Sequence, residues 1–335
     1  MTWPRGHSEP VVVVTRRWPI EVENELRRRC PAVRLSIDDT PLGPDGLRHA
    51  FEYADAVLPT VSDALPAQLF EGDIRTRFVG NFGVGTDHID VAAARAAGVT
   101  VTNTPGALTD ATADLAMSLL LSTARRTSAG ERELRSGNWS GWRPTHLLGA
   151  DVSGKHLGII GLGRIGAAVA RRARFGFDMR ITYCGNGGDT DLAGAAGRTG
   201  IPDLERADSI EDLLGHVDFV SVHVPGGGAN RHLLTADRLK LMKPTAYLIN
   251  TARGDVVDTV ALIDALRSGT IAGAGLDVHE GEPDVARELT ELENVTLLPH
   301  LGSATGEARR AMGFQVLDSL RAFLDGAEDV PCRVG

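Results

Sequence analysis

The chain has 335 residues, of which 42% are hydrophobic and 24% are charged, a composition typical of a soluble globular protein. A single hydrophobic core rarely extends over this length, which favours two domains. The formal net charge of −9 argues against nonspecific binding to nucleic acid, because such binding needs a basic surface.

The apolar stretches, the N-terminus and the cysteines exclude further classes of protein. The longest apolar stretch, around Leu115–Leu121, is too short to span a bilayer. The start, MTWPRGHSEP, has no apolar signal core. Cys30, Cys184 and Cys332 are scattered and form no CxxC pair, which argues against a disulfide framework or a zinc site. We therefore expect a cytoplasmic protein without a metal site.

Short β-branched runs alternate with helical stretches along the chain, which is the pattern of a parallel α/β architecture. Thr109–Thr127 is the clearest predicted helix, because Thr109 and Asp110 can cap it and leucines recur on one side. It precedes a polar stretch, residues 128–140, and we interpret it as the crossing between two domains. The predicted strands are Val11–Val14, Ala56–Pro59, Phe78–Phe82, Val99–Asn103, Leu157–Ile160, Arg180–Cys184, Phe219–Val224, Ala246–Asn250, Gly275–Val278 and Val295–Leu298.

A glycine-rich segment, GLGRIG, lies between the predicted strand ending at Ile160 and the helical run AAVARRARFG. Gly161 allows a tight turn, Gly163 lets the backbone approach a pyrophosphate, and Gly166 permits close packing of helix on strand. The start of the helix then offers free N–H groups to phosphates. Alone, GxGxxG could be a simple turn, but between strand and helix it predicts a dinucleotide site. The predicted pyrophosphate-binding residues are Gly161, Gly163, Arg164, Ile165 and Gly166.

The end of the next strand bears on the choice of cofactor. In NAD-binding chains a carboxylate at this position binds the ribose 2′-hydroxyl. Here Gly185 and Asn186 stand there, and Asp189 lies two glycines further along. A site without a carboxylate does not repel a 2′-phosphate, which favours NADP. No Arg or Lys follows before Arg198, however, so NAD stays an alternative.

Polar residues follow three of the later predicted strands, at the edge where open α/β sheets bind ligands. LINTARGDVVD places Arg253 there. GAGLDVHEGEP places Asp277 and Glu282, and LLPHLGSAT places His300. An Arg can hold the carboxylate of a 2-oxo acid and polarise its carbonyl, and a His can protonate the oxygen. A carboxylate beside the His favours its protonated form. Singly, each residue is explained as well by a surface ion pair, a loop acid or a core histidine.

Together with FGVGTDHID, TPGALTDATADLA and LMKPTAYLINTARGDVVD, these segments resemble the D-isomer-specific 2-hydroxyacid dehydrogenase family over nearly the whole chain. The resemblance implies that Arg253, Glu282 and His300 form the catalytic set. It also implies that backbone N–H groups of Val84 and Gly85 bind the substrate carboxylate. The residues that it implies in cofactor binding, beyond the glycine loop and the 185–186 position, are Thr112, Pro225, Thr251, Asp277 and Gly302, with Asp277 on the nicotinamide carboxamide.

The same resemblance implies a fold of two doubly wound parallel-sheet domains with a cleft between them. A Rossmann-type dinucleotide domain is expected over residues 105–295. A flavodoxin-like substrate domain is expected from both ends of the chain, over residues 1–104 and 296–335.

One segment favours a particular branch of the family. GNWSGWRP resembles the paired-tryptophan segment of the glyoxylate/hydroxypyruvate reductases, in which the second Trp, here Trp142, reaches the neighbouring subunit's active site. Simple packing at a dimer interface is the alternative for Trp142, and a homodimer is expected in either case. HVPGGGANRH departs from the family, because three glycines replace a Leu-Thr-Pro type run. The branch's NADP-using members carry an Arg near the position of Asn186, and this chain does not.

The sequence thus predicts an oxidoreductase that transfers hydride between NAD(P)H and a small 2-oxo acid, giving a D-2-hydroxy acid. Glyoxylate and hydroxypyruvate are the expected substrates. A dehydrogenase for a bulkier 2-oxo acid is one alternative. A dinucleotide-sensing protein that resembles the corepressors related to this family is another.

Overall fold

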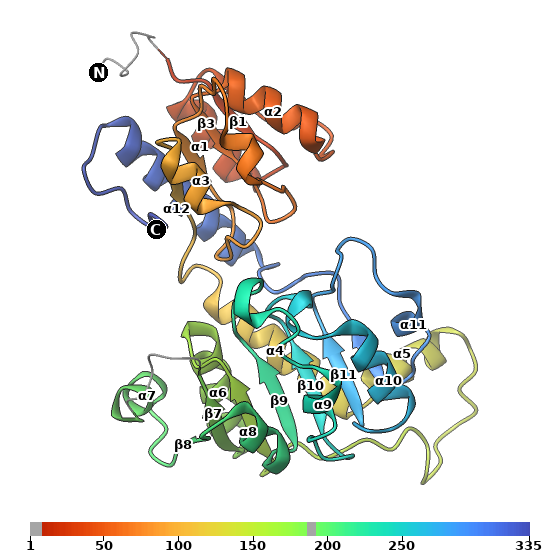
Figure 1. The fold of residues 1–335 in the computed structure, drawn as a ribbon. Coiled ribbons are helices and arrows are strands. Elements are labelled where there is room, and N and C mark those ends of the chain that lie inside the picture. Colours follow the sequence, from red (N-terminus) through yellow and green to blue (C-terminus); the bar gives the residue numbers. More distant parts are fainter. Residues whose placement is uncertain (1–8, 186–191) are drawn as a thin grey trace. The chain divides into compact units, whose positions relative to one another are not determined.

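The computed structural model describes residues 9–185 and 192–335, and the chain divides into two compact units (Figure 1). Unit 1 comprises residues 1–108 and 304–335, and unit 2 comprises residues 109–303. The sequence placed the two crossings at 104/105 and 295/296. No helix among the described residues is both long and apolar enough to cross a membrane.

Unit 1 is built on a five-stranded parallel sheet. Its strands are β1 (Val12–Val14), β2 (Val33–Arg34), β3 (Ala56–Leu58), β4 (Phe78–Gly80) and β5 (Thr100–Thr102). Its helices are α1 (Ile20–Arg29), α2 (Gly43–Tyr53), η1 (Ala67–Phe70), α3 (Val91–Ala96) and α12 (Gly306–Leu324). The strand order β2-β1-β3-β4-β5 is the flavodoxin-like order that the sequence predicted.

The C-terminal helix α12 completes the core of unit 1. Its buried residues Met312, Val316 and Leu317 join a hydrophobic cluster with α1 and with strands β1, β3 and β4. Gly313 lets α12 approach α1, since a Cβ at this position would lie 2.7 Å from both methyl carbons of Val22. Thr305 caps the helix by accepting the N–H of Ala308. The two ends of the chain therefore fold into one unit.

Unit 2 is built on a seven-stranded parallel sheet of order β12-β11-β10-β9-β6-β7-β8. The strands are β6 (His156–Ile160), β7 (Arg180–Cys184), β8 (Glu205–Arg206), β9 (Phe219–Val222), β10 (Tyr247–Asn250), β11 (Gly273–Leu276) and β12 (Val295–Leu297). The helices are α4 (Thr109–Ala124), α5 (Thr127–Arg135), α6 (Arg164–Phe177), α7 (Leu192–Thr199), α8 (Ile210–His216), η2 (Gly228–Asn230), α9 (Ala236–Leu239), η3 (Gly254–Val256), α10 (Thr259–Arg267) and α11 (Arg287–Thr290). This is the predicted Rossmann-type order, extended by one strand.

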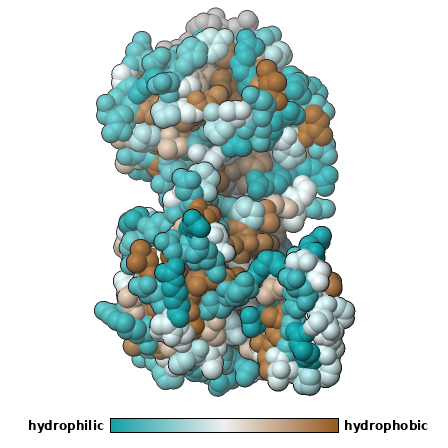
Figure 2. Space-filling model, turned by 90° about the vertical axis from the view of Figure 1, so that its right-hand side faces the viewer, coloured by the Kyte–Doolittle hydropathy of each residue, from teal (hydrophilic) through white to brown (hydrophobic). Residues whose placement is uncertain are grey.

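Helices cover both faces of this sheet, so its strands are buried on both sides. Ile159 packs into the cluster under α4 and α6, whereas Ile160 packs into the opposite cluster with α8 and α10. Burial on two faces explains why the strands are continuous apolar runs in the sequence. The face of the molecule in Figure 2 is mostly hydrophilic, with hydrophobic side chains in scattered patches.

All ten predicted strands are present, with ends that differ by a few residues. The two-residue edge strands β2 and β8 are additional, because a pair of residues carries no readable pattern. The predicted helix begins at Thr109 but ends at Ala124, and α5 occupies much of the expected polar stretch. The break between them lies at Arg126, whose φ of +53° is left-handed. Strand β12 pairs with β11, which keeps residues 295–297 in unit 2.

The contact of Gly313 with Val22 generates a first prediction. Gly313→Val should destabilise unit 1 by about 1–3 kcal/mol, because the added methyl groups overpack the junction of α1 and α12. Gly306→Val is the matched control in the same helix, since a Cβ there meets no atom within 4 Å. Urea denaturation of both variants measures the difference. Equal stabilities would show that the two helices do not pack this closely.

Candidate active site

Arg253, Glu282 and His300 follow three neighbouring strands of unit 2, β10, β11 and β12. Because these strands are parallel, their carboxyl ends meet at one edge of the sheet. Ligands of open α/β sheets bind outside this edge. The structure therefore brings the three residues predicted as catalytic to the same edge of one unit.

The turn that carries Arg253 is held by the last residue of β10. Asn250 is 1% exposed, and its Oδ1 accepts the N–H of Ala252 at 3.0 Å while its Nδ2 donates to the carbonyl of Arg253 at 2.8 Å. Gly226, in the loop after β9, lies against the same turn. A Cβ there would be 2.7 Å from Cγ of Arg253, so one of the three unusual glycines makes room for the arginine stem.

His300 and Glu282 form a hydrogen-bonded pair. His300 Nδ1 lies 2.7 Å from Glu282 Oε2, and each side chain is 33% exposed. The second oxygen of Glu282 accepts the backbone N–H of His279 at 2.7 Å. Burial raises the pKa of Glu282, but the hydrogen bonds from His300 and from the His279 N–H outweigh it, so this pKa lies below its ordinary value. A carboxylate can only accept, so Nδ1 carries a proton and Nε2 is the nitrogen left for a ligand.

The backbone at His300 is left-handed, with φ of +56°, which is unfavourable for a residue with a side chain. Asp277, directly after β11, holds it there. Its carbonyl accepts the N–H of His300 at 2.8 Å. Its carboxylate oxygens accept the N–H groups of Leu301 at 2.6 Å and Gly302 at 2.8 Å. Three bonds from one residue thus fix the direction of the His300 loop.

The Asp277 carboxylate is fully buried, and burial raises its pKa while the two N–H groups partly oppose that rise. Thr112, on α4, extends the cluster by donating its hydroxyl to the carbonyl of Gly302 at 2.9 Å. Thr112, Asp277 and Gly302 were each predicted to contact the cofactor. The structure joins them in one hydrogen-bonded cluster, a link that residues so distant in sequence could not reveal.

The glycine loop after β6 has the geometry that a pyrophosphate needs. Gly161 has φ of +94°, and a Cβ there would lie 2.8 Å from the backbone of the loop after β9. A Cβ at Gly166 would lie 2.2 Å from the carbonyl of Gly161, whereas one at Gly163 would meet no atom within 4 Å. No side chain caps α6, so N–H groups at its start, including those of Arg164 and Ile165, stay available to an anion. These residues fit a dinucleotide.

Other predicted cofactor residues lie at the same edge of unit 2. Pro225 follows β9, and Thr251 follows β10. The Thr251 hydroxyl is buried without a hydrogen-bond partner in the described part of the chain, which suits a polar ligand group. Gly185 follows β7, and a Cβ there would meet no atom within 4 Å. Asn186 lies outside the described residues.

In unit 1 the segment predicted to bind the substrate carboxylate follows β4. Asn81 Nδ2 donates to the carbonyls of Gly83 at 3.1 Å and Gly85 at 2.8 Å, and Asn103 Nδ2 donates to that of Val84 at 2.8 Å. With their carbonyls bound, Val84 and Gly85 keep N–H groups that have no acceptor among the described residues. The sequence did not identify the two asparagines, which orient this loop.

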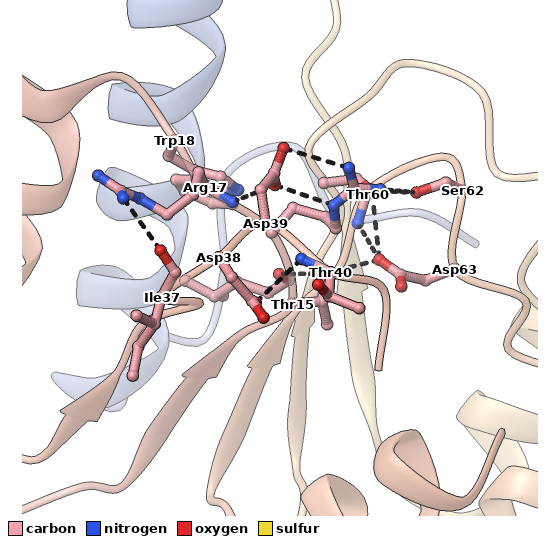
Figure 3. A network of polar contacts seen from close by, with 12 residues as sticks. Thr15, Arg17, Trp18, Ile37, Asp38, Asp39, Thr40, Thr60, Ser62 and Asp63 are labelled. Atoms are coloured by element: carbon pink, nitrogen blue, oxygen red, sulfur yellow. Dashed lines mark hydrogen bonds and ion pairs between the residues drawn. The ribbon is translucent and has the colours of Figure 1, made fainter. Parts of the chain in front are cut away.

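The neighbouring loops at this edge of unit 1 are joined by the buried carboxylate of Asp63 and the exposed carboxylate of Asp39 (Figure 3). Asp63 accepts the hydroxyl of Thr15 at 2.6 Å and the N–H of Thr60 at 2.8 Å, which joins the loops after β1 and β3. Asp39 accepts the N–H of Arg17 at 2.8 Å and so joins the loop after β2. The loop of Val84 and Gly85 therefore lies beside loops that are joined to one another by hydrogen bonds.

The predicted paired-tryptophan segment follows α5 and runs along the outside of unit 2 (Figure 1). Trp142 is 81% exposed and Trp139 is 52% exposed. Leu134 and Leu148, at either end of the segment, are also exposed. This much apolar surface on one segment is typical of a face that another protein chain covers.

Comparison with known proteins identifies the family to which the chain is similar. Residues 117–302 match the sequence profile of the D-isomer specific 2-hydroxyacid dehydrogenase family, NAD binding domain. The chain is 45% identical over 327 residues to the glyoxylate reductase of Pyrococcus horikoshii, covering 95% of this chain and 94% of that protein.

Two solved structures are similar over almost the whole chain. A Polaromonas protein assigned to the D-isomer specific 2-hydroxyacid dehydrogenases has a TM-score of 0.87 and 36% identity, covering 98% of this chain and 100% of that one. An NADPH-dependent glyoxylate/hydroxypyruvate reductase from Sinorhizobium meliloti, in complex with NADP and malonate, has a TM-score of 0.83 and 34% identity. That match covers 98% of this chain and 97% of the other.

The three hydrogen bonds that Asp277 accepts from the His300 loop generate a second prediction. Asp277→Asn turns an NH₂ group toward one of the two backbone N–H donors and should cost about 1–3 kcal/mol of stability in unit 2. Because the His300 loop loses a tether, kcat/KM should fall as well. Asp258→Asn is the control, since Asp258 caps α10 and Asn caps equally well. Thermal unfolding and steady-state kinetics of both variants test this prediction. Equal stability and equal kcat/KM in the two variants would show that the Asp277 carboxylate does not hold the His300 loop.

Proposed function

The chain belongs to the D-isomer-specific 2-hydroxyacid dehydrogenase family, and we propose that it reduces glyoxylate or hydroxypyruvate to the D-2-hydroxy acid. It is an oxidoreductase with a nicotinamide dinucleotide cofactor. The observation that carries the proposal is the His300–Glu282 pair at 2.7 Å, in the loops after β12 and β11, with the Arg253 turn after the neighbouring strand β10. That pair can deliver a proton at the sheet edge where the glycine loop opens.

Each proposed catalytic residue has a defined role. Arg253 binds the substrate carboxylate and polarises the carbonyl with its guanidinium. His300 donates a proton from Nε2 to the carbonyl oxygen, and Glu282 stabilises the imidazolium through Nδ1. The N–H groups of Val84 and Gly85 are proposed as further partners of the substrate carboxylate. Bound reduced nicotinamide supplies the hydride.

The cofactor is proposed to be NADP, with NAD as the alternative. The glycine loop would hold the pyrophosphate, and the buried hydroxyl of Thr251 and the Asp277 cluster would lie toward the nicotinamide end. Gly185 supports NADP, because it leaves no carboxylate at the strand end to repel a 2′-phosphate. A similar reductase from Sinorhizobium meliloti is described as NADPH-dependent.

We also propose a homodimer. The segment exposes four large apolar side chains, Leu134, Trp139, Trp142 and Leu148, and a second copy of the chain would cover them. Trp142 then either contributes to the partner's active site or packs at the interface.

The proposed role of Arg253 predicts the effect of removing it. Arg253→Ala should lower kcat/KM for glyoxylate and hydroxypyruvate about 10²–10³-fold, since the carbonyl loses its charged donor. Arg267→Ala, at the exposed end of α10, is the control and should leave kcat/KM unchanged. The assay uses a panel of small and bulky 2-oxo acids with NADPH and NADH separately. Tight cofactor binding without turnover of any 2-oxo acid would indicate a sensor instead of an enzyme.

The Glu282–His300 pair predicts the pH dependence. The pKa of Glu282 is lowered, so its carboxylate persists at working pH and is lost only as pH falls through that lowered pKa. Reduction requires protonated His300, and Glu282→Gln removes the charge that favours it. Reduction by the variant should therefore be slower than in the wild type wherever the wild-type Glu282 carboxylate is ionised, and the difference should shrink as pH falls through the lowered pKa of Glu282. Profiles of kcat/KM against pH that superimpose would exclude this role for Glu282.

A further inference from the structure

The edge strand β8 brings an arginine beside the end of β7. Arg206 is the last residue of β8 and lies in register with Tyr183. The pairing continues past it, because the N–H of Ala207 donates to the carbonyl of Tyr183 at 2.9 Å. Gly185 stands two residues after Tyr183. Strand spacing and rise place the Cα atoms of Arg206 and Gly185 about 8 Å apart, within reach of an arginine side chain.

The charge on Arg206 is available to a ligand. Its side chain is exposed, and no hydrogen bond or ion pair of the guanidinium is found in the described part of the chain. Two other arginines of unit 2 are engaged, since Arg238 pairs with Glu211 and Arg174 pairs with Asp203. Glu205, which precedes Arg206, accepts the hydroxyl of Thr182 and so turns to β7 instead of to the arginine.

The positive charge of Arg206 also lies close to the end of β7. Burial raises the pKa of the Cys184 thiol, and the positive charge of Arg206 is the first of the influences that oppose this rise. Cys184 is the residue directly before Gly185, at the position where the ribose of a dinucleotide would lie.

We propose that Arg206 binds the 2′-phosphate of NADP, beside the open position at Gly185. The assignment rests on the proposed function. A guanidinium presents a planar fork of N–H donors that matches two phosphate oxygens, and Gly185 presents no side chain in the way. The sequence has no Arg or Lys in the loop that begins at Gly185, and the neighbouring strand β8 supplies an arginine in its place.

Binding measurements on the full-length protein test the proposal without turnover. Dissociation constants are measured for NADPH, NADH and adenosine 2′-monophosphate, by fluorescence titration or equilibrium dialysis. Arg206→Ala should raise the Kd of NADPH and of adenosine 2′-monophosphate about tenfold or more and leave that of NADH within about twofold. Arg206→Lys should fall between the wild type and Arg206→Ala, because it restores charge without the fork.

Arg180→Ala is the matched control, since Arg180 is exposed at the opposite end of β7 and its substitution removes the same net charge. Its constants should equal those of the wild type. Equal weakening of NADPH and NADH by Arg206→Ala, or no weakening, would overturn the assignment. A wild type that binds NADH more tightly than NADPH would overturn it too, while reduction of 2-oxo acids with NADH would leave the proposed reaction standing.

Discussion

Asp277 accepts the N–H groups of Leu301 and Gly302 with its buried carboxylate and that of His300 with its carbonyl. Through these bonds the residue at the end of β11 fixes the conformation of the loop after β12. The hydrogen bonds offset the cost of the left-handed backbone at His300. The imidazole then meets Glu282, whose second oxygen is bound by the His279 N–H. A buried charge used in this way favours one arrangement of the loop over its alternatives, because any other leaves a carboxylate unpaired.

The same cluster links the two halves of the proposed chemistry within unit 2. Thr112 reaches Gly302 from α4, and Asn250 shapes the Arg253 turn on the neighbouring strand. The proposed proton delivery and carboxylate binding would thus depend on side chains that contact the backbone and need not touch the substrate. Preorganisation of this kind lets an enzyme orient its donors before the substrate arrives.

Much of this architecture could be predicted from the sequence, because the patterns that indicate it lie within short segments of the chain. The strand–GLGRIG–helix segment and the apolar strands carry their own pattern, and both sheet orders match the expected fold. Strand β8 and helix α5 were not predicted, since two residues show no periodicity and a polar helix shows little. Pairing of Asp277 with the His300 loop joins residues far apart in the chain, so only the folded sheet reveals it.

Hydrogen exchange at the backbone amides of Leu301 and Gly302 tests the central role of the Asp277 carboxylate most directly. Both amides lie in a loop, where exchange is ordinarily fast. If the carboxylate holds them, they should be protected to the same degree as the amides of strand β11. Exchange at the rate of exposed loop amides would contradict the account, because the His300–Glu282 pair would then lack its support.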